Sequence, residues 1–227
     1  VYKRQEMSID RKPDGAVVYY CHHCNTSGSV QPHKERQLSA VPSPKIFQSG
    51  SLNANHIEYL KSRGISEETA KKLKLFGNTK YFTRLGKETD AIGFPYYRDG
   101  ALVGVKYRSF PEKDFTAESG GQYDFFGLDQ VTKGDPLIIV EGEMDALTLH
   151  EVGITNAVSV PSGAPMKVAD GKMKASEDKK FSFVWNAREY LDAAPYIVLA
   201  TDQDVPGQAL AEELARRIGK DKCRLAK

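Results

Sequence analysis

Two acidic motifs are the parts of this sequence best suited to chemistry. Glu-Gly-Glu-Met-Asp at residues 141–145 directly follows an apolar run, and Asp-Gln-Asp at residues 202–204 directly follows another. When two such runs are strands of one parallel sheet, their carboxyl ends open into a single crevice where ligands bind. Glu141, Asp202 and Asp204 are therefore expected to converge, although they lie far apart in the sequence. Because crowded carboxylates repel one another and a hard divalent cation relieves that repulsion, we expect the site to hold Mg²⁺ or Mn²⁺.

The same motifs have an alternative interpretation that involves no metal. Acidic residues that follow a strand often cap the next helix, where the positive end of the helix dipole stabilises them. For either motif alone the two interpretations are equally good. The occurrence of both motifs at strand exits of one α/β unit favours the metal centre.

Three basic residues are candidates for binding phosphate groups. Lys106 and Arg108 lie two positions apart in a strand-like stretch, so they share one face of it, and Lys113 follows shortly afterwards. An arginine grips two phosphate oxygens, whereas a lysine acts as a mobile point charge. The alternative for each of them is a solvated charge on an exposed strand.

A Cys-x-x-Cys pair near the start of the chain has the spacing of half a zinc site. Cys21 and Cys24 supply two ligands, whereas a structural zinc ion takes four. Neighbouring histidines, namely His22, His23 and His33, offer only a makeshift completion. A redox-active pair is the other alternative, but that pair expects a strand-to-helix setting, which this segment lacks. The third cysteine, Cys223, is expected to be a small core residue.

The scaffold for these residues is predicted from apolar periodicity. The last third of the chain alternates in type, with strands predicted at residues 137–140, 157–160 and 196–200 and helices at 144–151 and 207–219. This alternation predicts a parallel sheet with helices packed on it, preceded by a mixed α+β part.

The preceding part is predicted to contain helices and hairpins. Residues 53–76 indicate two short helices, the second capped by Ser66, and residues 91–110 indicate a hairpin that turns at Asp99-Gly100. Another hairpin is expected near the amino terminus around Asp14-Gly15. The predicted organisation is therefore a half zinc ribbon at 1–30, a proline-containing linker at 31–48, an α+β domain at 49–133 and the parallel-sheet domain at 134–227.

Composition excludes some classes of protein and leaves others open. The 227 residues carry a formal net charge of +2, so bulk charge makes no case for nucleic acid as a partner. The longest apolar runs are far too short to cross a bilayer, so no membrane association is expected. Three cysteines make no disulfide framework, which favours a reduced, intracellular setting. The start at Val1 and an incipient strand at the other end indicate a piece of a longer protein.

The two acidic motifs resemble the signatures of the Toprim domain. The matching residues are Ile-Val-Glu-Gly-Glu-Met-Asp at 139–145 and Ala-Thr-Asp-Gln-Asp-Val-Pro-Gly at 200–207. Bacterial-type primases, topoisomerases, OLD-type nucleases and RecR-type recombination mediators share this domain. The resemblance implies that Glu141, Asp202 and Asp204 handle the metal, with Asp145 close to it. A further acidic ligand is expected beyond the end of this chain.

The segment between residues 59 and 128 resembles the amino-terminal part of a primase polymerase core. The matching pieces, in order, are Tyr-Leu-Lys-Ser-Arg-Gly-Ile-Ser at 59–66, Gly-Phe-Pro-Tyr at 93–96, Lys-Tyr-Arg at 106–108, Lys-Asp-Phe at 113–115 and Phe-Phe-Gly-Leu at 125–128. The likeness is strongest to phage T7-like primase-helicases and their organellar Twinkle relatives. It implies that Lys106 and Lys113 assist nucleotidyl transfer, and that further arginines contact template or triphosphate, namely Arg63, Arg84, Arg98 and Arg108.

The resemblance implies a DNA primase that makes RNA primers on single-stranded DNA from ribonucleoside triphosphates. It also implies a zinc ribbon, completed upstream of Val1, that holds Zn²⁺ through Cys21 and Cys24. No Gly-x-x-x-x-Gly-Lys-Ser/Thr occurs here, so a fused or associated replicative helicase is expected outside this stretch. The expected location is the cytoplasm of a phage-infected bacterial cell or, as the second choice, an organelle matrix.

Two other functions share parts of this pattern. A RecR-like, non-catalytic DNA-binding module also joins a zinc site to a Toprim domain, but it lacks a block like residues 59–128. A Toprim nuclease uses the same carboxylates for hydrolysis. The lysine-rich segment at residues 163–195 resembles an insertion in plant-type Twinkle proteins, and a structural role is preferred for it over a DNA contact through Trp185 and Tyr190.

Overall fold

The computed structural model describes residues 7–13, 16–22, 24–30, 50–110, 112–169, 171 and 178–226. The chain divides into two compact units, Val1–Ser43 and Pro44–Lys227. The expected linker at residues 31–48 and the expected turn at Asp14-Gly15 lie outside the described residues. No helix in the described ranges is long and apolar enough to cross a bilayer.

The first unit contains a three-stranded antiparallel sheet, with strand order β1-β2-β3. Its strands are β1 (Met7–Arg11), β2 (Val17–Cys21) and β3 (Thr26–Val30). The first two strands form the expected pair, with Met7 opposite Cys21. The third strand was not predicted, because Thr-Ser-Gly-Ser-Val contains the glycine and serines of a loop and gains its place from pairing with β2.

The second unit begins with the two predicted helices, α1 (Ala54–Ser62) and α2 (Glu67–Lys72). Their amino termini are capped by Asn53 and Ser66, whose side chains accept hydrogen bonds from the backbone N–H groups of His56 and Thr69. The helices start at these residues because each cap satisfies a backbone donor that has no partner within the helix.

A four-stranded antiparallel sheet follows, in the order β4-β5-β6-β7. Its strands are β4 (Phe76–Phe82), β5 (Lys87–Arg98), β6 (Ala101–Ser109) and β7 (Phe115–Ala117). The predicted hairpin between β5 and β6 is confirmed. Asp99 and Gly100 both have positive φ, 49° and 77°, as the tight turn between two such strands requires.

The last part of the second unit contains a parallel sheet in the order β11-β10-β8-β9. After a short 3-10 helix η1 (Leu128–Gln130), its elements are β8 (Leu137–Val140), α3 (Glu143–Glu151), β9 (Ala157–Ser159), α4 (Ser182–Asn186), α5 (Arg188–Ala193), β10 (Ile197–Ala200), α6 (Val205–Ile218) and β11 (Cys223–Leu225). All three strand pairs are parallel, so the α/β fold class expected for this part is confirmed.

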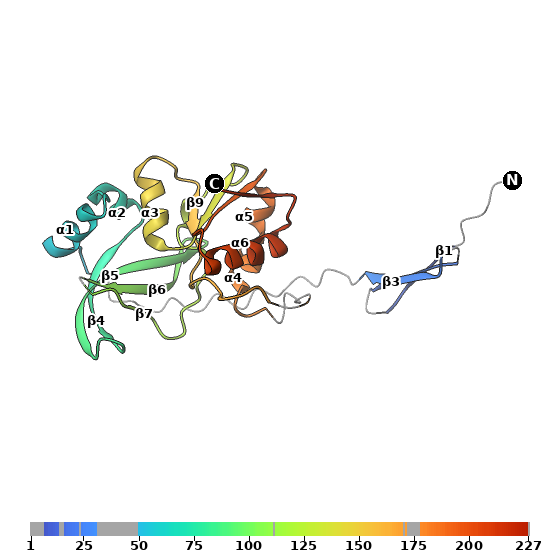
Figure 1. The fold of residues 1–227 in the computed structure, drawn as a ribbon, viewed down its shortest axis with the longest axis horizontal. Coiled ribbons are helices and arrows are strands. Elements are labelled where there is room, and N and C mark those ends of the chain that lie inside the picture. The colour runs from blue at the N-terminus through green and yellow to red at the C-terminus, as the bar shows by residue number, and fades with distance from the viewer. Residues whose placement is uncertain are drawn as a thin grey trace. The chain divides into compact units, whose positions relative to one another are not determined.

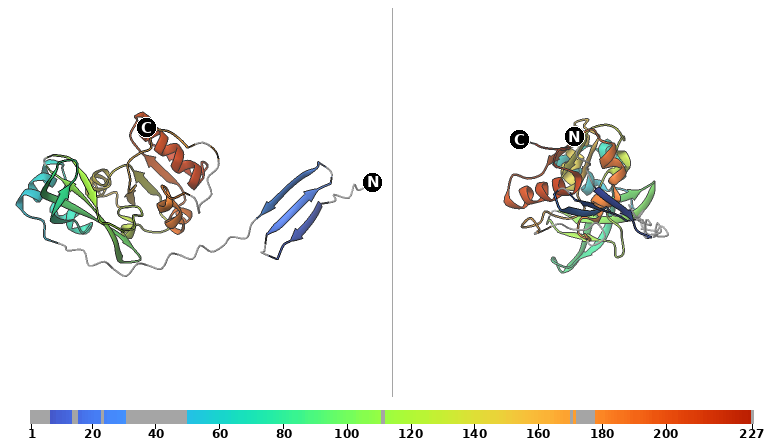
Figure 2. Two further views of the ribbon diagram at one scale, coloured as in Figure 1. Left: turned by 90° about the horizontal axis from the view of Figure 1, so that it is seen from below. Right: turned by 90° about the vertical axis from the view of Figure 1, so that its right-hand side faces the viewer.

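The parallel sheet is buried on both faces, which explains its uninterrupted apolar strands. Leu137 and Ile139 pack with α4, α5 and α6 on one face, whereas Ile138 and Val140 pack toward α3 and the antiparallel sheet. Figures 1 and 2 show α3 on one side of this sheet and α6 on the other. One of the apolar clusters of the described residues therefore combines side chains from both predicted parts, 49–133 and 134–227.

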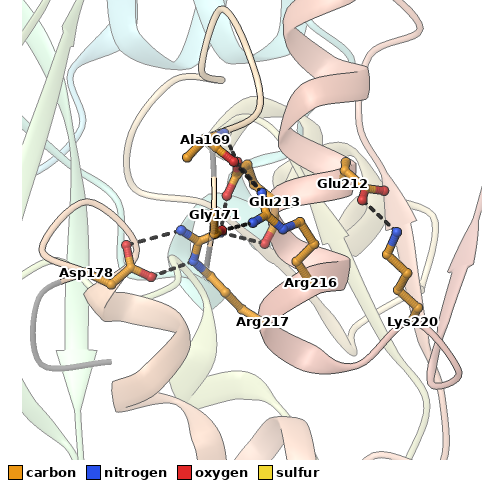
Figure 3. A network of polar contacts seen from close by, with 8 residues as sticks. All are labelled: Ala169, Gly171, Asp178, Glu212, Glu213, Arg216, Arg217 and Lys220. Carbon is orange, nitrogen blue, oxygen red and sulfur yellow. Dashed lines mark hydrogen bonds and ion pairs between the residues drawn. The ribbon is translucent and has the colours of Figure 1, made fainter. Parts of the chain in front are cut away.

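A polar network fastens the described part of the 163–195 insertion to α6 (Figure 3). Arg217 lies at its centre, with Nε 2.5 Å from Oδ2 of Asp178, and it also pairs with Glu213. Glu213 accepts a hydrogen bond from the backbone N–H of Ala169, and Arg216 donates to the carbonyl oxygens of Ala169 and Gly171.

The two aromatic residues of the insertion that were considered for DNA contact lie against the protein itself. The indole Nε1 of Trp185 donates to Asp178, 3.1 Å away, and the partly buried Tyr190 packs against the core around α6. These contacts agree with the structural role preferred for the insertion.

Candidate active site

The pairing of β8 with β10 brings the two acidic motifs together. Val140 lies opposite Ala200 in this parallel pair, so Glu141 and Thr201 leave the sheet side by side at its carboxyl edge. Asp202 follows at once. This juxtaposition is the one expected from the sequence, and it arises because both motifs begin where a buried strand ends.

Glu141 has a carboxyl group in an unfavourable environment for a negative charge. Partial burial raises the pKa of this carboxyl, and the charge of Asp202 raises it further, while hydrogen bonding with the Asp202 backbone partly offsets the shift. Asp204 and Asp145 also raise it. Its Oε2 atom is buried and has no hydrogen-bond partner. A cation at this oxygen would relieve both the repulsion and the missing contact.

The other two aspartates of the motifs act as helix caps in this structure. Asp145 accepts a hydrogen bond from the backbone N–H of Gly142 at the start of α3, 3.0 Å away. Asp204 caps α6 by accepting from the backbone N–H of Gly207 at 2.8 Å. The capping interpretation therefore applies to one residue of each motif.

The oxygen ligands at this edge fit a divalent cation in kind. Across the described ranges, no three His, Cys, Asp or Glu side chains converge closely enough to hold an ion as they stand. Mg²⁺, however, is usually held by one or two carboxylates, with waters and substrate phosphates filling the other positions. The unsatisfied Glu141 oxygen beside Asp202 meets that requirement. Metal binding by Glu141, Asp145, Asp202 and Asp204 stays a prediction.

The first acidic motif also binds a residue of the antiparallel sheet. Nζ of Lys106 lies 2.7 Å from Oε1 of Glu143, and the hydroxyl of Tyr96 donates to the same oxygen at 2.6 Å. Lys106 also donates to the carbonyl oxygen of Pro161 at 3.3 Å. Burial and the neighbouring charge of Glu143 raise the pKa of Tyr96 well above its usual value, so the hydroxyl keeps its proton and remains a donor.

Sequence reasoning missed Glu143 as a site residue. It is the first residue of α3, a position where an acidic residue is ordinary. Glu143 could have been recognised from its place in the acidic motif at residues 141–145. Its partner Lys106, however, lies 37 residues earlier, and only the fold brings the two together.

The predicted basic residues gather around one aromatic ring. The side-chain cations of Lys106, Arg108 and Lys113 lie 4.9, 5.7 and 5.7 Å from the centre of the Phe115 ring. The Arg108 guanidinium also lies 5.6 Å from the centre of the Tyr59 ring, and its Nε atom is buried without a hydrogen-bond partner. The structure therefore assembles one patch from Lys106, Arg108 and Lys113, which we call the cation cluster.

The other three predicted arginines lie in different surroundings. Arg63, after α1, is close enough to Asp145 to lower the pKa of that carboxyl, although burial keeps the net shift upward. Arg84 pairs with Asp114 at 3.3 Å and donates to the carbonyl oxygen of Lys113.

Arg98 is the least available of the three. It pairs with Asp124 at 2.6 Å and with Gln122 at 2.7 Å, and its side chain is only 12% exposed. These contacts are internal to the fold. For all three arginines, contact with template or triphosphate stays a prediction.

The half zinc site lies in the first unit. Cys21 and Cys24 are both unbonded to another cysteine, and Sγ of Cys24 donates to Oγ1 of Thr26 at 3.2 Å. In the thiolate form the Cys24 sulfur accepts hydrogen bonds from the Thr26 side chain, the main cause, and from the Thr26 backbone, and these lower the pKa of the Cys24 thiol and favour the form that metals bind. His23 and His33 lie outside the described residues, and zinc binding stays a prediction.

Comparison with known proteins gives consistent results for both halves of the second unit. Residues 135–226 match the Toprim domain family. A chloroplastic/mitochondrial Twinkle homolog protein of Arabidopsis thaliana is 43% identical over 231 residues, which cover 96% of this chain and 32% of that protein. A primase homolog protein of the same plant is 42% identical over 226 residues, which cover 95% of this chain and 65% of the relative.

A solved structure gives the same picture. The crystal structure of the primase fragment of the bacteriophage T7 primase-helicase superposes with a TM-score of 0.59 at 26% identity. The match covers 94% of this chain and 82% of the phage chain. The chain thus spans about a third of one plant relative and just under two thirds of the other.

Proposed function

Given that the chain belongs with the Toprim primases of the T7 and Twinkle type, we propose that it synthesises short RNA primers on single-stranded DNA. The observation that carries the proposal is the contact between Lys106 of the antiparallel sheet and Glu143 of the first acidic motif. This contact makes one site from two subdomains. A RecR-like module needs no such basic sheet, and the plant relatives match along nearly the whole chain, including residues 59–128.

The proposed reaction joins two ribonucleotides with loss of pyrophosphate. Lys106, Arg108 and Lys113 bind and neutralise phosphate oxygens of the incoming triphosphate. Glu141 and Asp202, with Asp204 and Asp145 beside them, hold divalent cations at the carboxyl edge of the sheet. When bound, such a cation polarises the phosphate and lowers the pKa of the attacking hydroxyl group.

The wider setting follows the relatives and belongs to the same proposal. Since a relative named chloroplastic/mitochondrial is 43% identical, we place the chain in organelle DNA replication rather than in a phage-infected cell. The primase-helicase that supplies the similar phage fragment supports a replicative helicase fused to this chain or associated with it. In the intact protein, Cys21 and Cys24 belong to a zinc ribbon completed by residues outside this chain.

The proposal is tested by primer synthesis with the intact protein, a single-stranded template, ribonucleotides and Mg²⁺. Asp202→Ala with Asp204→Ala is expected to abolish primers and to weaken Mn²⁺ binding. Asp135→Ala with Asp221→Ala is the matched control, because it removes two exposed acidic side chains outside the acidic motifs. Equal primer yield from the parent and the Asp202/Asp204 variant would overturn the proposed mechanism. Template hydrolysis without synthesis would identify a nuclease instead.

A further inference from the structure

Phe115 is a half-exposed ring in the middle of the cation cluster. It belongs to the three-residue edge strand β7, where it lies opposite Arg108, and Ala117 lies opposite Lys106. Cross-strand partners project from the same face of a sheet, so the ring and the two cations share one face. The ring is 39% exposed. Single exposed aromatic residues are ordinary, so the exposure alone assigns no role.

A cavity lies beside the Phe115 ring, and the ring forms part of its wall. The cavity measures about 310 Å³, and its lining comprises Lys106, Phe115, Thr116, Ala117, Tyr123 and Pro161. That volume is at the lower end of the range for sites that bind small molecules. The Tyr123 hydroxyl donates to the carbonyl oxygens of Val105 and Glu118, at 3.1 and 2.9 Å. Tyr123 therefore contributes mainly its ring to the cavity wall.

Lys106 connects this cavity to the acidic motif. Its side chain lines the cavity, and the same Nζ atom contacts Glu143 and the carbonyl oxygen of Pro161. A ligand with a flat ring against Phe115 would therefore place its anionic part among three cations and next to the first acidic motif. A nucleotide has this combination of a planar base and negatively charged phosphates.

We propose that this cavity takes the base of a ribonucleoside triphosphate, with Phe115 as the stacking surface and the cation cluster as the phosphate site. The inference rests on the proposed function and deepens it, because it assigns a substrate-positioning role to Phe115, whose place in Lys-Asp-Phe at residues 113–115 gave no role to its ring. Stacking on a ring is tolerant of sequence, since every base has a flat face.

The test measures binding of three probes to the intact protein, namely ATP, inorganic tripolyphosphate and oligothymidylate. Phe115→Ala is expected to weaken ATP binding about 5- to 150-fold, the range for the loss of one base–aromatic stack, and to leave tripolyphosphate binding unchanged. Phe115→Trp is expected to restore ATP binding. Arg108→Gln is expected to weaken ATP and tripolyphosphate alike, because it removes a cation and keeps the ring.

Two variants separate the role of the ring from a general effect on the fold. Tyr81→Ala removes another exposed ring, 55% exposed, from β4 at the opposite edge of the same sheet, and ATP binding should not change. Phe115→Leu keeps apolar bulk without an aromatic face, so it should bind ATP as weakly as Phe115→Ala. If Phe115→Ala does not fold, Phe115→Leu decides the question.

The outcomes distinguish this inference from the proposed function. Unchanged ATP affinity in Phe115→Leu overturns the nucleotide cavity, even when the parent makes primers. Loss of oligothymidylate binding with normal ATP binding also overturns it and assigns the ring to the template. Weakened ATP binding with normal tripolyphosphate binding supports the cavity, even when the parent makes no primers and the proposed reaction has failed.

Discussion

Lys106 and Glu143 form an ion pair across the boundary between the two sheets of the second unit, with Nζ and Oε1 2.7 Å apart. The Glu143 side chain is 5% exposed and that of Lys106 is 19% exposed. Tyr96 donates to the same carboxylate oxygen and so helps to satisfy it. The pair both fixes the position of a predicted catalytic lysine and joins two parts of the fold. Mutations can therefore separate its effect on primer synthesis from its effect on stability.

We expect Lys106→Met to destabilise the protein by about 3 kcal/mol, because it leaves the buried Glu143 carboxylate without its counter-charge. Adding Glu143→Gln to this variant should recover most of the loss, since the buried charge is then gone. Primer synthesis should stay at least about 100-fold below the parent in both variants, because the lysine cation is missing. Urea unfolding and primer yield measure the two effects.

The control for this pair is Lys71→Met, which removes an exposed i,i+4 partner of Glu67 and should change stability by less than about 1 kcal/mol. A double variant no more stable than Lys106→Met would contradict the buried-charge explanation.

Gly207 is predicted to be irreplaceable because the backbone of Asp202 approaches it closely. A Cβ atom at residue 207 would lie 2.1 Å from the carbonyl oxygen of Asp202, a contact that only movement of the second acidic motif can relieve. Gly207→Ala should therefore lower Mn²⁺ affinity and primer synthesis at least about tenfold, the size of effect that small displacements in a site produce. Gly163→Ala, which meets no atom within 4 Å, should leave both unchanged.

Glu141 is expected to destabilise the metal-free protein at neutral pH. Its folded-state pKa is raised by burial and by Asp202, so the folded chain binds more protons than the unfolded chain between the ordinary and the raised pKa. Stability contributed by the protonated form is consequently lost as pH rises through that window. Glu141→Gln should be more stable than the parent at pH 7.5 in a chelator. The difference should vanish below pH about 4, where the glutamate is protonated in both states.

Urea titrations at the two pH values measure this effect. Addition of Mg²⁺ at pH 7.5 should stabilise the parent more than Glu141→Gln, since the ion binds the folded carboxylate. A parent that is more stable than the variant in chelator at pH 7.5 would show that the Glu141 charge is already compensated.

Arg217 is predicted to be the key residue of the polar network in Figure 3 that joins Asp178, Glu213 and Arg217, which we call the clamp. Arg217→Met should destabilise the protein by about 3 kcal/mol, because it leaves the buried carboxylates of Asp178 and Glu213 without their counter-charge. Lys220→Met, which breaks an exposed pair with Glu212, should cost less than about 1 kcal/mol. Urea unfolding of both variants measures the two losses of stability. Equally small losses in Arg217→Met and Lys220→Met would show that the clamp is dispensable.

The clamp should also depend on pH. Burial raises the pKa of Asp178, but hydrogen bonds from Arg217 and Trp185 and the charge of Arg217 outweigh it and hold the pKa below its usual value. Burial likewise raises the pKa of Glu213, but hydrogen bonds from Arg217 and the backbone of Ala169 and the charges of Arg217 and Arg216 outweigh it and lower that pKa. The stability due to these carboxylates is therefore present above their ordinary pKa values and is lost as pH falls through the lowered ones. The difference in free energy of unfolding between the parent and Arg217→Met should therefore become smaller at acidic pH.

The sequence alone was sufficient to predict those features that depend on neighbouring residues. The apolar runs of β8 and β10, the Asp-Gly turn between β5 and β6 and the cap at Ser66 are each encoded within a few positions. Because both acidic motifs directly follow buried strands, their meeting at one sheet edge also followed from the sequence. By contrast, β3 and β4 were missed, since glycine and polar residues interrupt them and pairing with adjacent strands holds them in place.

Only the tertiary structure determined which side chains meet between the two sheets of the second unit and around Phe115. Glu143 looks like an ordinary first residue of a helix until the packing of the two sheets places Lys106 and Tyr96 on its carboxylate. Phe115 looks like one aromatic residue among many until the register of β6 with β7 surrounds it with cations. Local sequence sets backbone preference and burial over a few residues. Contacts across 37 positions depend on strand register and sheet packing, which a single sequence does not specify locally.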